Sequence, residues 1–369
     1  MKKKLAIICA NLEQLPLVEK AKEMGIETHC FSWDKGDTSC KGIADYFHPI
    51  SILEKEQILE KCREIEIDGV VVINNDYAVP TVAFVAQNMG LPGNRYEDMI
   101  MAAGNKYTMR QALHKHKVKS PRFAIAHEGV DLSEFKYPLI VKATDRCASL
   151  GIVKVEKEQD LWEAIRQAQE LSFKKEVIIE EFISGSETGV DAISYNGEHH
   201  ILALIEREMI FENNLPKRVA KHFPFELPAD IHDKIIIETK KALDAINFKN
   251  GPSNTEFKIT DAGEVFVLET SPLTCTSPLL MKLYNGYDFL EGLIHVALGQ
   301  FEKPVFTQKK YSGDYVCRQG MDNIRQAIEN KENDPDIIEA VLYNEGKNNL
   351  GRIGYFIYQS DHKRRWNVK

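Results

Sequence analysis

The first hundred residues alternate short apolar runs with helical patterns, and this alternation narrows the architecture that the N-terminal part can adopt. Leu5–Cys9 is a continuous apolar run, as expected of a strand buried on both faces of a parallel sheet. A helical pattern follows and stops at Gly25, Glu27–Phe31 is the next predicted strand, and a further helix leads to a buried strand at Gly69–Ile73. The pattern predicts a doubly wound, Rossmann-like α/β domain over residues 1–95.

The turn after the first strand lacks the glycines that a dinucleotide-binding fold places there. It reads Cys9-Ala10-Asn11-Leu12 instead of G-x-G-x-x-G, so nothing in this turn favours a dinucleotide. We therefore expect this domain to be structural or to contact a substrate.

Charge and apolar patterning exclude several classes of function. The formal net charge is −8, so no global attraction to nucleic acid or anionic lipid is expected. No stretch approaches the ~18 apolar residues of a membrane helix, and the short apolar run behind Lys2–Lys4 is too brief for a signal core. The seven cysteines are odd in number and lack C-x-x-C spacing, which favours neither a disulfide framework nor a zinc site. We expect a cytoplasmic protein without a nucleic-acid or membrane partner.

The rest of the chain divides at turn clusters. Leu91–Asn94 indicates a domain boundary, and Met99–His116 is predicted to form one helix. Short strands then surround a predicted helix at Glu158–Leu171, and the last seventy or so residues combine three strand-like runs with a short helix. The predicted parts are an α/β domain at 1–95, a domain at 96–300 with a smaller subdomain at about 120–185, and a C-terminal α+β subdomain at 301–369.

Two lysines are candidates for contacts with phosphate. Lys142 ends the apolar strand Tyr137–Lys142, and a charge at the end of a buried strand is costly unless an anion meets it. Lys106 stands near the start of a helix, and the polar loop at 144–151 can offer backbone amides to phosphate. Because a strand-end lysine is often an ordinary surface charge, the prediction depends on the order of all the candidates along the chain.

Carboxylates follow in an order that suits a nucleotide with Mg²⁺. Val177–Ile183 passes from an apolar strand into two acids, as a hinge beside a purine would, and Glu187 is placed to accept hydrogen bonds from ribose. Two strands flank the turn Asp261–Gly263 and predict an antiparallel hairpin whose arms carry Glu256 and Glu269. If both carboxylates share one face, they can bridge Mg²⁺ between phosphate oxygens, since Mg²⁺ takes oxygen ligands.

A cationic segment between two predicted strands is a further candidate. Lys217, Arg218 and Lys221 can reach a γ-phosphate or an acyl phosphate, although a solvated strand edge explains them equally well. We take Arg218 as a candidate catalytic cation beside Lys142, Glu256 and Glu269.

With these residues in this order, residues 1–300 resemble the ATP-grasp superfamily, specifically the carboxylate–amine ligases similar to the ATP-binding halves of carbamoyl-phosphate synthase and biotin carboxylase. The resemblance implies a Rossmann-like domain followed by an ATP-grasp fold, with ATP and Mg²⁺ as cofactors and Mn²⁺ as an alternative metal. It also implies contacts for phosphate, adenine, ribose and metal. These are Lys106, Lys142, Ser149 and Gly151 for phosphate; Glu180, Glu181, Phe182 and Ile183 at the adenine hinge, with Glu181 and Ile183 acting through backbone; Glu187 for ribose; and Glu256, Glu269 and Ser271 for metal.

The chain departs from the family pattern at four positions. Ala148 replaces a lid-loop glycine, and Ser271 replaces an amide-bearing metal ligand. Leu273 stands where an arginine often faces the acyl substrate, and Asn254 stands where many relatives have a histidine. ATP binding is therefore better supported than any particular substrate.

The expected activity is that of an ADP-forming ligase. A small carboxylate would be activated as an acyl phosphate and passed to an amine or another nucleophile, and a homodimer is compatible with this activity. One alternative is a bicarbonate-activating carboxylase or carbamoyl-phosphate-synthase-like subunit, which Leu273 disfavours because bicarbonate needs cationic partners. A second alternative is a degenerate module that binds ATP without turnover.

Overall fold

The N-terminal part is a parallel sheet, as the alternation of strands and helices predicted. The computed structural model describes residues 2–146, 151–212, 215–274, 276–343 and 351–368. The first four strands pair in the order β3-β2-β1-β4, and all three pairings are parallel. Their bounds are β1 (Lys4–Ile8), β2 (Glu27–Phe31), β3 (Tyr46–His48) and β4 (Gly69–Val71). The Rossmann-like prediction is confirmed.

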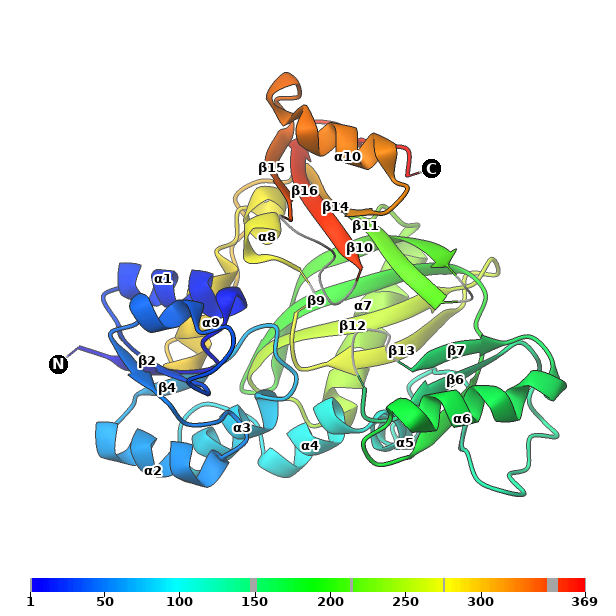
Figure 1. Cartoon of the computed structure of the whole chain (residues 1–369), viewed down its shortest axis with the longest axis horizontal. Coiled ribbons are helices and arrows are strands. Elements are labelled where there is room, and N and C mark those ends of the chain that lie inside the picture. The colour runs from blue at the N-terminus through cyan, green and yellow to red at the C-terminus, as the bar shows by residue number, and fades with distance from the viewer. Residues whose placement is uncertain (1, 147–150, 213–214, 275, 344–350, 369) are drawn as a thin grey trace.

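Helices cover both faces of this sheet because each strand buries alternate residues on opposite sides. Leu5 and Ile7 pack with one group of helices, whereas Ala6 and Ile8 pack with the other. The first group is α1 (Leu15–Glu23) and α9 (Phe289–Ala297), and the second is α2 (Lys55–Ile65) and α3 (Val79–Met89). Figure 1 shows α9, which comes from late in the chain, beside α1 on the N-terminal sheet.

The single helix predicted at Met99–His116 is wrong, because two helices occupy this segment. They are α4 (Tyr96–Gly104) and α5 (Lys106–Lys115). Asn105 between them has extended backbone angles, and its side-chain oxygen accepts hydrogen bonds from the amides of Tyr107 and Thr108. This is the geometry of an N-cap, so Asn105 ends one helix and starts the next with Lys106 in its first position.

A second, four-stranded antiparallel sheet lies within residues 120–185, the range in which a smaller subdomain was predicted. Its strands run in the order β5-β8-β6-β7, and α6 (Leu161–Leu171) packs its apolar side on them. The strand bounds are β5 (Phe123–Ile125), β6 (Leu139–Ala143), β7 (Ile152–Val155) and β8 (Val177–Glu181). We call this unit the lid subdomain (green, lower right in Figure 1).

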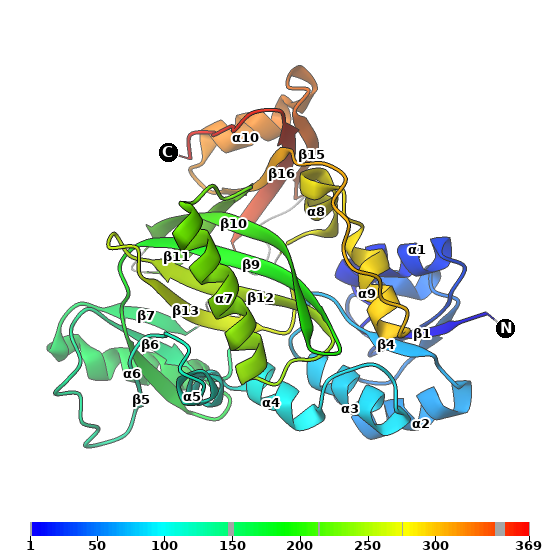
Figure 2. The same cartoon turned by 180° about the vertical axis from the view of Figure 1, so that it is seen from behind.

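The largest sheet has eight strands in the order β13-β12-β9-β10-β11-β14-β16-β15. The strands are β9 (Ser186–Tyr195), β10 (Glu198–Glu212), β11 (Leu215–Phe223), β12 (Gly251–Ile259), β13 (Val265–Ser271), β14 (Tyr311–Arg318), β15 (Ile337–Leu342) and β16 (Arg352–Ser360). Figure 2 shows α7 (Ala229–Ala245) lying across one face of the sheet. The predicted hairpin is confirmed: β12 and β13 pair antiparallel, with Glu256 directly opposite Glu269.

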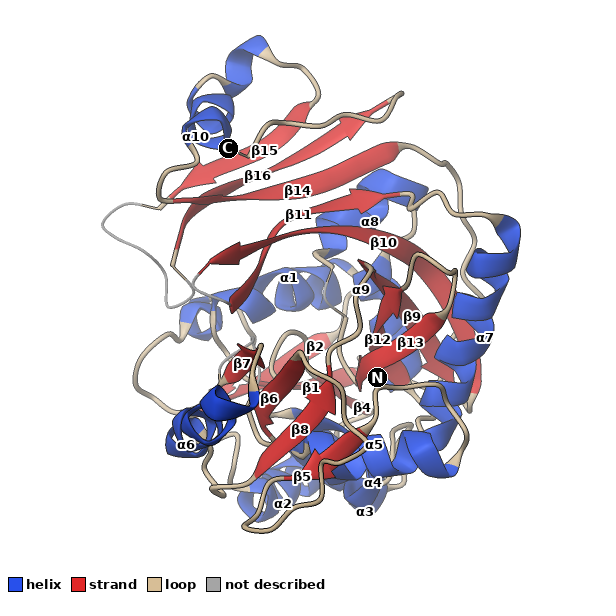
Figure 3. Ribbon diagram, turned by 90° about the vertical axis from the view of Figure 1, so that its right-hand side faces the viewer, coloured by secondary structure: helices blue, strands red, loops and turns tan. Residues whose placement is uncertain are grey.

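The C-terminal strands extend the large sheet, because β14 pairs with β11 (Figure 3). The remaining helices are α8 (Pro278–Asn285) and α10 (Asp322–Glu329), with short 3-10 turns at Leu12–Gln14, Ser39–Gly42, Glu158–Asp160 and Lys331–Asn333. The predicted domain boundaries near residues 95 and 300 stay predictions. None of the described helices combines the length and apolar character that crossing a bilayer requires.

Candidate active site

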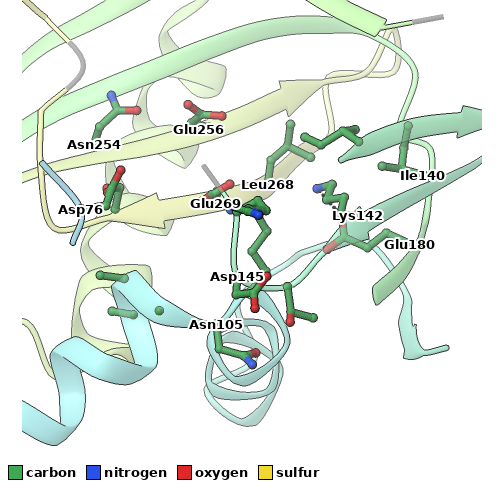
Figure 4. Close-up of a pocket in the computed structure, with 18 of the residues that line it drawn as sticks. Asp76, Asn105, Ile140, Lys142, Asp145, Glu180, Asn254, Glu256, Leu268 and Glu269 are labelled. Carbon is green, nitrogen blue, oxygen red and sulfur yellow. Dashed lines mark hydrogen bonds and ion pairs between the residues drawn. The ribbon is translucent and has the colours of Figure 1, made fainter. Parts of the chain in front are cut away.

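A cavity of about 610 Å³ lies between the N-terminal domain, the lid subdomain and the large sheet. Figure 4 shows side chains around it from Asn105, which precedes α5, from the lid strands and from the β12–β13 hairpin. Ten residues named from the sequence line this one cavity. They are Lys106, Lys142, Glu180, Glu181, Phe182, Ile183, Glu187, Glu256, Glu269 and Ser271.

Lys106 enters the cavity from the first turn of α5. Its Nζ lies 2.7 Å from Oε1 of Glu269, and its backbone amide donates to the carbonyl of Thr144 at 2.8 Å. Although burial lowers the pKa of Lys106, the carboxylates of Glu269, Glu256 and Asp76 outweigh this effect and raise it above its ordinary value. A charged lysine at the positive end of a helix dipole suits a site for phosphate.

Lys142 belongs to a buried group of three charges. Its Nζ lies 2.7 Å from Oε2 of Glu180, and Oε1 of the same carboxylate accepts from Arg110 at 2.6 Å. Burial raises the pKa of Glu180, but the two cations outweigh burial and lower it to about 2. Glu180 is therefore ionised at neutral pH. The group as a whole has one excess positive charge, which Lys142 presents to the cavity.

The two hairpin carboxylates stand on adjacent strands and share a face, as Figure 4 shows. Glu256 pairs with Arg207 at 2.7 Å, while Glu269 pairs with Lys106 at the same distance. Ser271 is two residues beyond Glu269 on the same strand and also lines the cavity. Within the described residues, no group of three or more His, Cys, Asp or Glu could hold a metal by itself. Two carboxylates and a hydroxyl suit Mg²⁺, which keeps waters and shares phosphate oxygens.

Arg207 on β10 links Glu256 to its neighbours. Besides Glu256, it donates to Oδ1 of Asn254 at 3.0 Å and lies 3.5 Å from Oε1 of Glu187. Its guanidinium crosses Gly189 on β9, where a Cβ would stand only 3.0 Å from Nη2. Glycine at this position therefore lets one arginine reach from β10 across β9 to β12.

The residues expected at the adenine and ribose positions have other contacts too. The amide of Glu181 donates to the carbonyl of Arg122 at 3.0 Å, and Phe182 donates to Pro138 at 3.1 Å. Glu187 lies 3.4 Å from Nζ of Lys258 in addition to its contact with Arg207. The adenine and ribose roles themselves remain predictions.

Two expected residues are not among the described residues that line the cavity. Arg218 pairs with Asp314 on the neighbouring strand β14, so its guanidinium neutralises a carboxylate within the sheet. Gly151 has a positive φ of 71° and follows the loop just before β7. Ser149 lies outside the described residues.

Three residues with no distinct sequence signal complete the site. Arg207 sits in the ordinary-looking run Glu206-Arg207-Glu208, and Arg110 is one of several cations on a helix. Asp76 follows β4 and lines the cavity from the N-terminal domain, at the strand ends where open α/β sheets bind ligands. The partners of Arg207 and Arg110 are distant in the sequence, so local patterns could not identify these two residues.

Comparisons with known proteins agree with this geometry. Residues 135–278 match the model of the ATP-grasp domain. A D-alanine–D-alanine ligase from Geotalea uraniireducens is 28% identical over 142 residues, 38% of this chain and 45% of the relative. The large chain of a carbamoyl phosphate synthase from Thermoanaerobacter sp. is 25% identical over 284 residues, 74% of this chain and 25% of the relative.

This chain therefore spans less than half of either curated relative. Among solved structures, L-amino acid ligase from Bacillus licheniformis has a TM-score of 0.79 at 21% identity, and the match covers 98% of this chain and 94% of the other. Because residues 135–278 match the family model, the chain contains an ATP-grasp domain.

Proposed function

We propose that this protein is an ATP-dependent, ADP-forming ligase that activates a small carboxylate as an acyl phosphate and joins it to an amine. One observation carries the proposal: two lysines and two opposed carboxylates from three separate segments line a single cavity. ATP-grasp ligation requires cations for phosphate and carboxylates for metal within reach of the same nucleotide.

The described residues fit ATP and Mg²⁺. Lys106 and Lys142 supply positive charge for the phosphates, and Ile140 and Leu268 give part of the wall an apolar character suited to adenine. Glu256 and Glu269 would hold Mg²⁺, with Mn²⁺ as an alternative. The ion would supply charge neutralisation on the phosphates.

The protein's own groups contribute mainly position and charge. In the proposed reaction a substrate carboxylate oxygen attacks the γ-phosphorus and ADP leaves. The amine nitrogen then attacks the acyl carbon, phosphate leaves, and the amine proton is released. Lys106 and Lys142 would offset the negative charge that develops on the phosphates.

Part of the cavity lining favours an amine over bicarbonate. The residues that line it from the N-terminal domain include Asp76 and Tyr77, and the hairpin side contributes Leu273, which is buried. A carboxylate and an apolar side chain suit an incoming ammonium group better than a second small anion, which requires cations.

The test is ADP release in a screen of carboxylates, each with and without pooled amines. We expect turnover only when both substrate classes are present, and transfer of ¹⁸O from the substrate carboxylate into released phosphate. Turnover with bicarbonate alone would replace the proposal with a carboxylase. Tight ATP binding without turnover would replace it with the degenerate module, and release of AMP with pyrophosphate would exclude the acyl phosphate.

A further inference from the structure

Arg110 is a fully buried cation just behind the cavity. It lies on α5 one turn after Lys106, its side chain is 1% exposed, and it is not among the cavity-lining residues. A buried guanidinium is costly unless its donors are satisfied by well-aligned acceptors. The groups that accept hydrogen bonds from Arg110 therefore indicate which parts of the fold it holds together.

The first set of contacts reaches the lid subdomain. Nε and Nη2 of Arg110 donate to Oε1 of Glu180 at 3.0 and 2.6 Å. The other oxygen of Glu180 accepts from Nζ of Lys142 at 2.7 Å. Because Glu180 is held on one side by Arg110, it presents a fixed acceptor to Lys142 on the other, and the ammonium group of Lys142 is thereby oriented.

The second set of contacts reaches the β12–β13 hairpin, which carries Glu256 and Glu269. Nη1 donates to the carbonyl of Val267 at 3.0 Å, and Nη2 donates to the carbonyl of Leu268 at 2.6 Å. Glu256 pairs with Glu269 but Phe257 pairs with Val267, so Leu268 is the extra residue of a β-bulge. A bulge leaves its extra residue outside the regular pairing and redirects the next side chain. Here the next residue is Glu269.

We propose that Arg110 is a positioning residue that sets the phosphate lysine Lys142 and the metal carboxylate Glu269 relative to each other. It does so by holding Glu180 of the lid subdomain and the Leu268 bulge of the hairpin with one guanidinium. The role in ligation rests on the proposed function, whereas the mechanical link between lid and hairpin does not.

The geometry of the guanidinium explains why this residue is an arginine. Four hydrogen bonds run from three nitrogen atoms to a carboxylate on β8 and to two consecutive carbonyls on β13. A lysine keeps the charge but places it on a single nitrogen, which cannot reach both sides at once. Arg110→Lys therefore keeps the charge but removes the hydrogen bonds that join the lid subdomain to the hairpin.

The test compares Arg110→Lys and Arg110→Met with Arg166→Lys, an exposed arginine on α6 that also pairs with carboxylates. Calorimetry measures the affinity for Mg-ATP and for adenosine. We expect both Arg110 variants to weaken the affinity for Mg-ATP by at least about tenfold, and to change the affinity for adenosine by less than about twofold. We also expect Arg110→Lys to raise the Mg²⁺ concentration that ATP binding requires. Equal weakening of ATP and adenosine would show a merely structural role and overturn the proposal.

A double-mutant cycle tests whether Arg110 acts through Lys142. If it does, Arg110→Lys combined with Lys142→Ala weakens Mg-ATP by clearly less than the product of the two single effects. Multiplicative effects would show that the two residues act independently, and that result would overturn the proposed route.

Amide hydrogen exchange on the ligand-free protein gives a readout that does not depend on ATP. In Arg110→Lys we expect faster exchange in residues 139–143, 177–181 and 265–271, with α7 unchanged. Unchanged exchange in all three strands would overturn the link. If the wild type failed to bind ATP, the proposed function would fall, and hydrogen exchange alone would still decide the role of Arg110.

Discussion

At the scale of single residues, the cavity cations are held in place before a ligand arrives. Lys106 and Lys142 each lie 2.7 Å from a carboxylate, Glu269 and Glu180 respectively. The two pairs differ in charge balance, because Glu180 pairs with Arg110 as well as with Lys142, whereas Glu269 pairs with Lys106. The Lys142 group therefore carries the excess positive charge that an anionic phosphate would compensate.

Removing this charge should weaken nucleotide binding. Lys142→Ala is expected to reduce ATP affinity at least about tenfold, roughly 1.4 kcal/mol, since a charge-assisted contact is lost. Lys157→Ala, an exposed lysine of the same subdomain that lies outside the cavity lining, should have no such effect. Calorimetric titration with ATP measures both, and equal affinities for wild type and Lys142→Ala would contradict the assignment.

The metal contact proposed for Ser271 has a consequence that can be measured. A serine hydroxyl is shorter than an asparagine amide, so its contact with Mg²⁺ would run through a water, at a cost on the order of 1 kcal/mol or about fivefold in Mg²⁺ requirement. Ser271→Asn should therefore saturate at equal or lower Mg²⁺ while keeping activity. The rate of ADP release against Mg²⁺ concentration measures this. Loss of turnover in a folded variant would show that Ser271 serves a substrate instead.

At the scale of elements, three neighbouring strands cooperate around Gly189. The side chain of Arg207 on β10 crosses β9 at this glycine and reaches Glu256 and Asn254 on β12. Since the guanidinium is held by several partners, it has little freedom to move away from an added methyl group. The smallest residue on β9 thus determines how Glu256 is held.

A methyl group at this glycine should disturb the metal site. In Gly189→Ala the Cβ would stand 3.0 Å from Nη2 of Arg207, so the guanidinium must shift and its contact with Glu256 weakens. We expect the Mg²⁺ requirement to rise about fivefold, as for one lost hydrogen bond. Gly42→Ala is the control, because nothing lies within 4 Å of a Cβ there. The measurement is the rate of ADP release against Mg²⁺ concentration, and the same dependence in Gly189→Ala and Gly42→Ala would refute this explanation.

At the scale of the whole molecule, the large sheet joins the strands β9–β13, here called the body, to the C-terminal strands β14–β16. The junction is the pairing of β11 with β14, in which Lys221 stands opposite Asp314 and His222 opposite Gly313. Behind it, Val219 of β11 belongs to the same apolar cluster as residues of β14 and β16. The C-terminal strands therefore share a core with the body.

Substitution at the junction should destabilise the fold without touching the cavity. A Cβ on Gly313 would lie 2.6 Å from Cε1 of Tyr358 and still closer to the carbonyl oxygen of Lys221. Because one of these neighbours is backbone, Gly313→Ala is expected to lower the free energy of unfolding by about 1–3 kcal/mol. Urea denaturation of Gly313→Ala, compared with that of Gly42→Ala, measures this free energy. An unchanged midpoint would argue against tight packing between β11, β14 and β16 at Gly313.

The sequence by itself determined those features that depend on nearby residues. Alternation of apolar runs and helices is enough to predict the parallel N-terminal sheet, since its period follows from local geometry. The short turn at Asp261–Gly263 is enough to predict that its two arms pair, but the register that places Glu256 opposite Glu269 depends on the bulge at Leu268. The strand-end position of Lys142 likewise pointed to an anion partner.

Tertiary structure decided the features that join distant segments. The contacts of Arg110 with Glu180 and with the Leu268 carbonyl span 70 and 158 residues, and no local pattern encodes them. Sheet order brought Arg207, and not Arg218, to Glu256, because β10 lies one strand nearer to β12 than β11 does. Local periodicity specifies which residues form each element, whereas the burial of charge and apolar surface between elements selects which side chains meet.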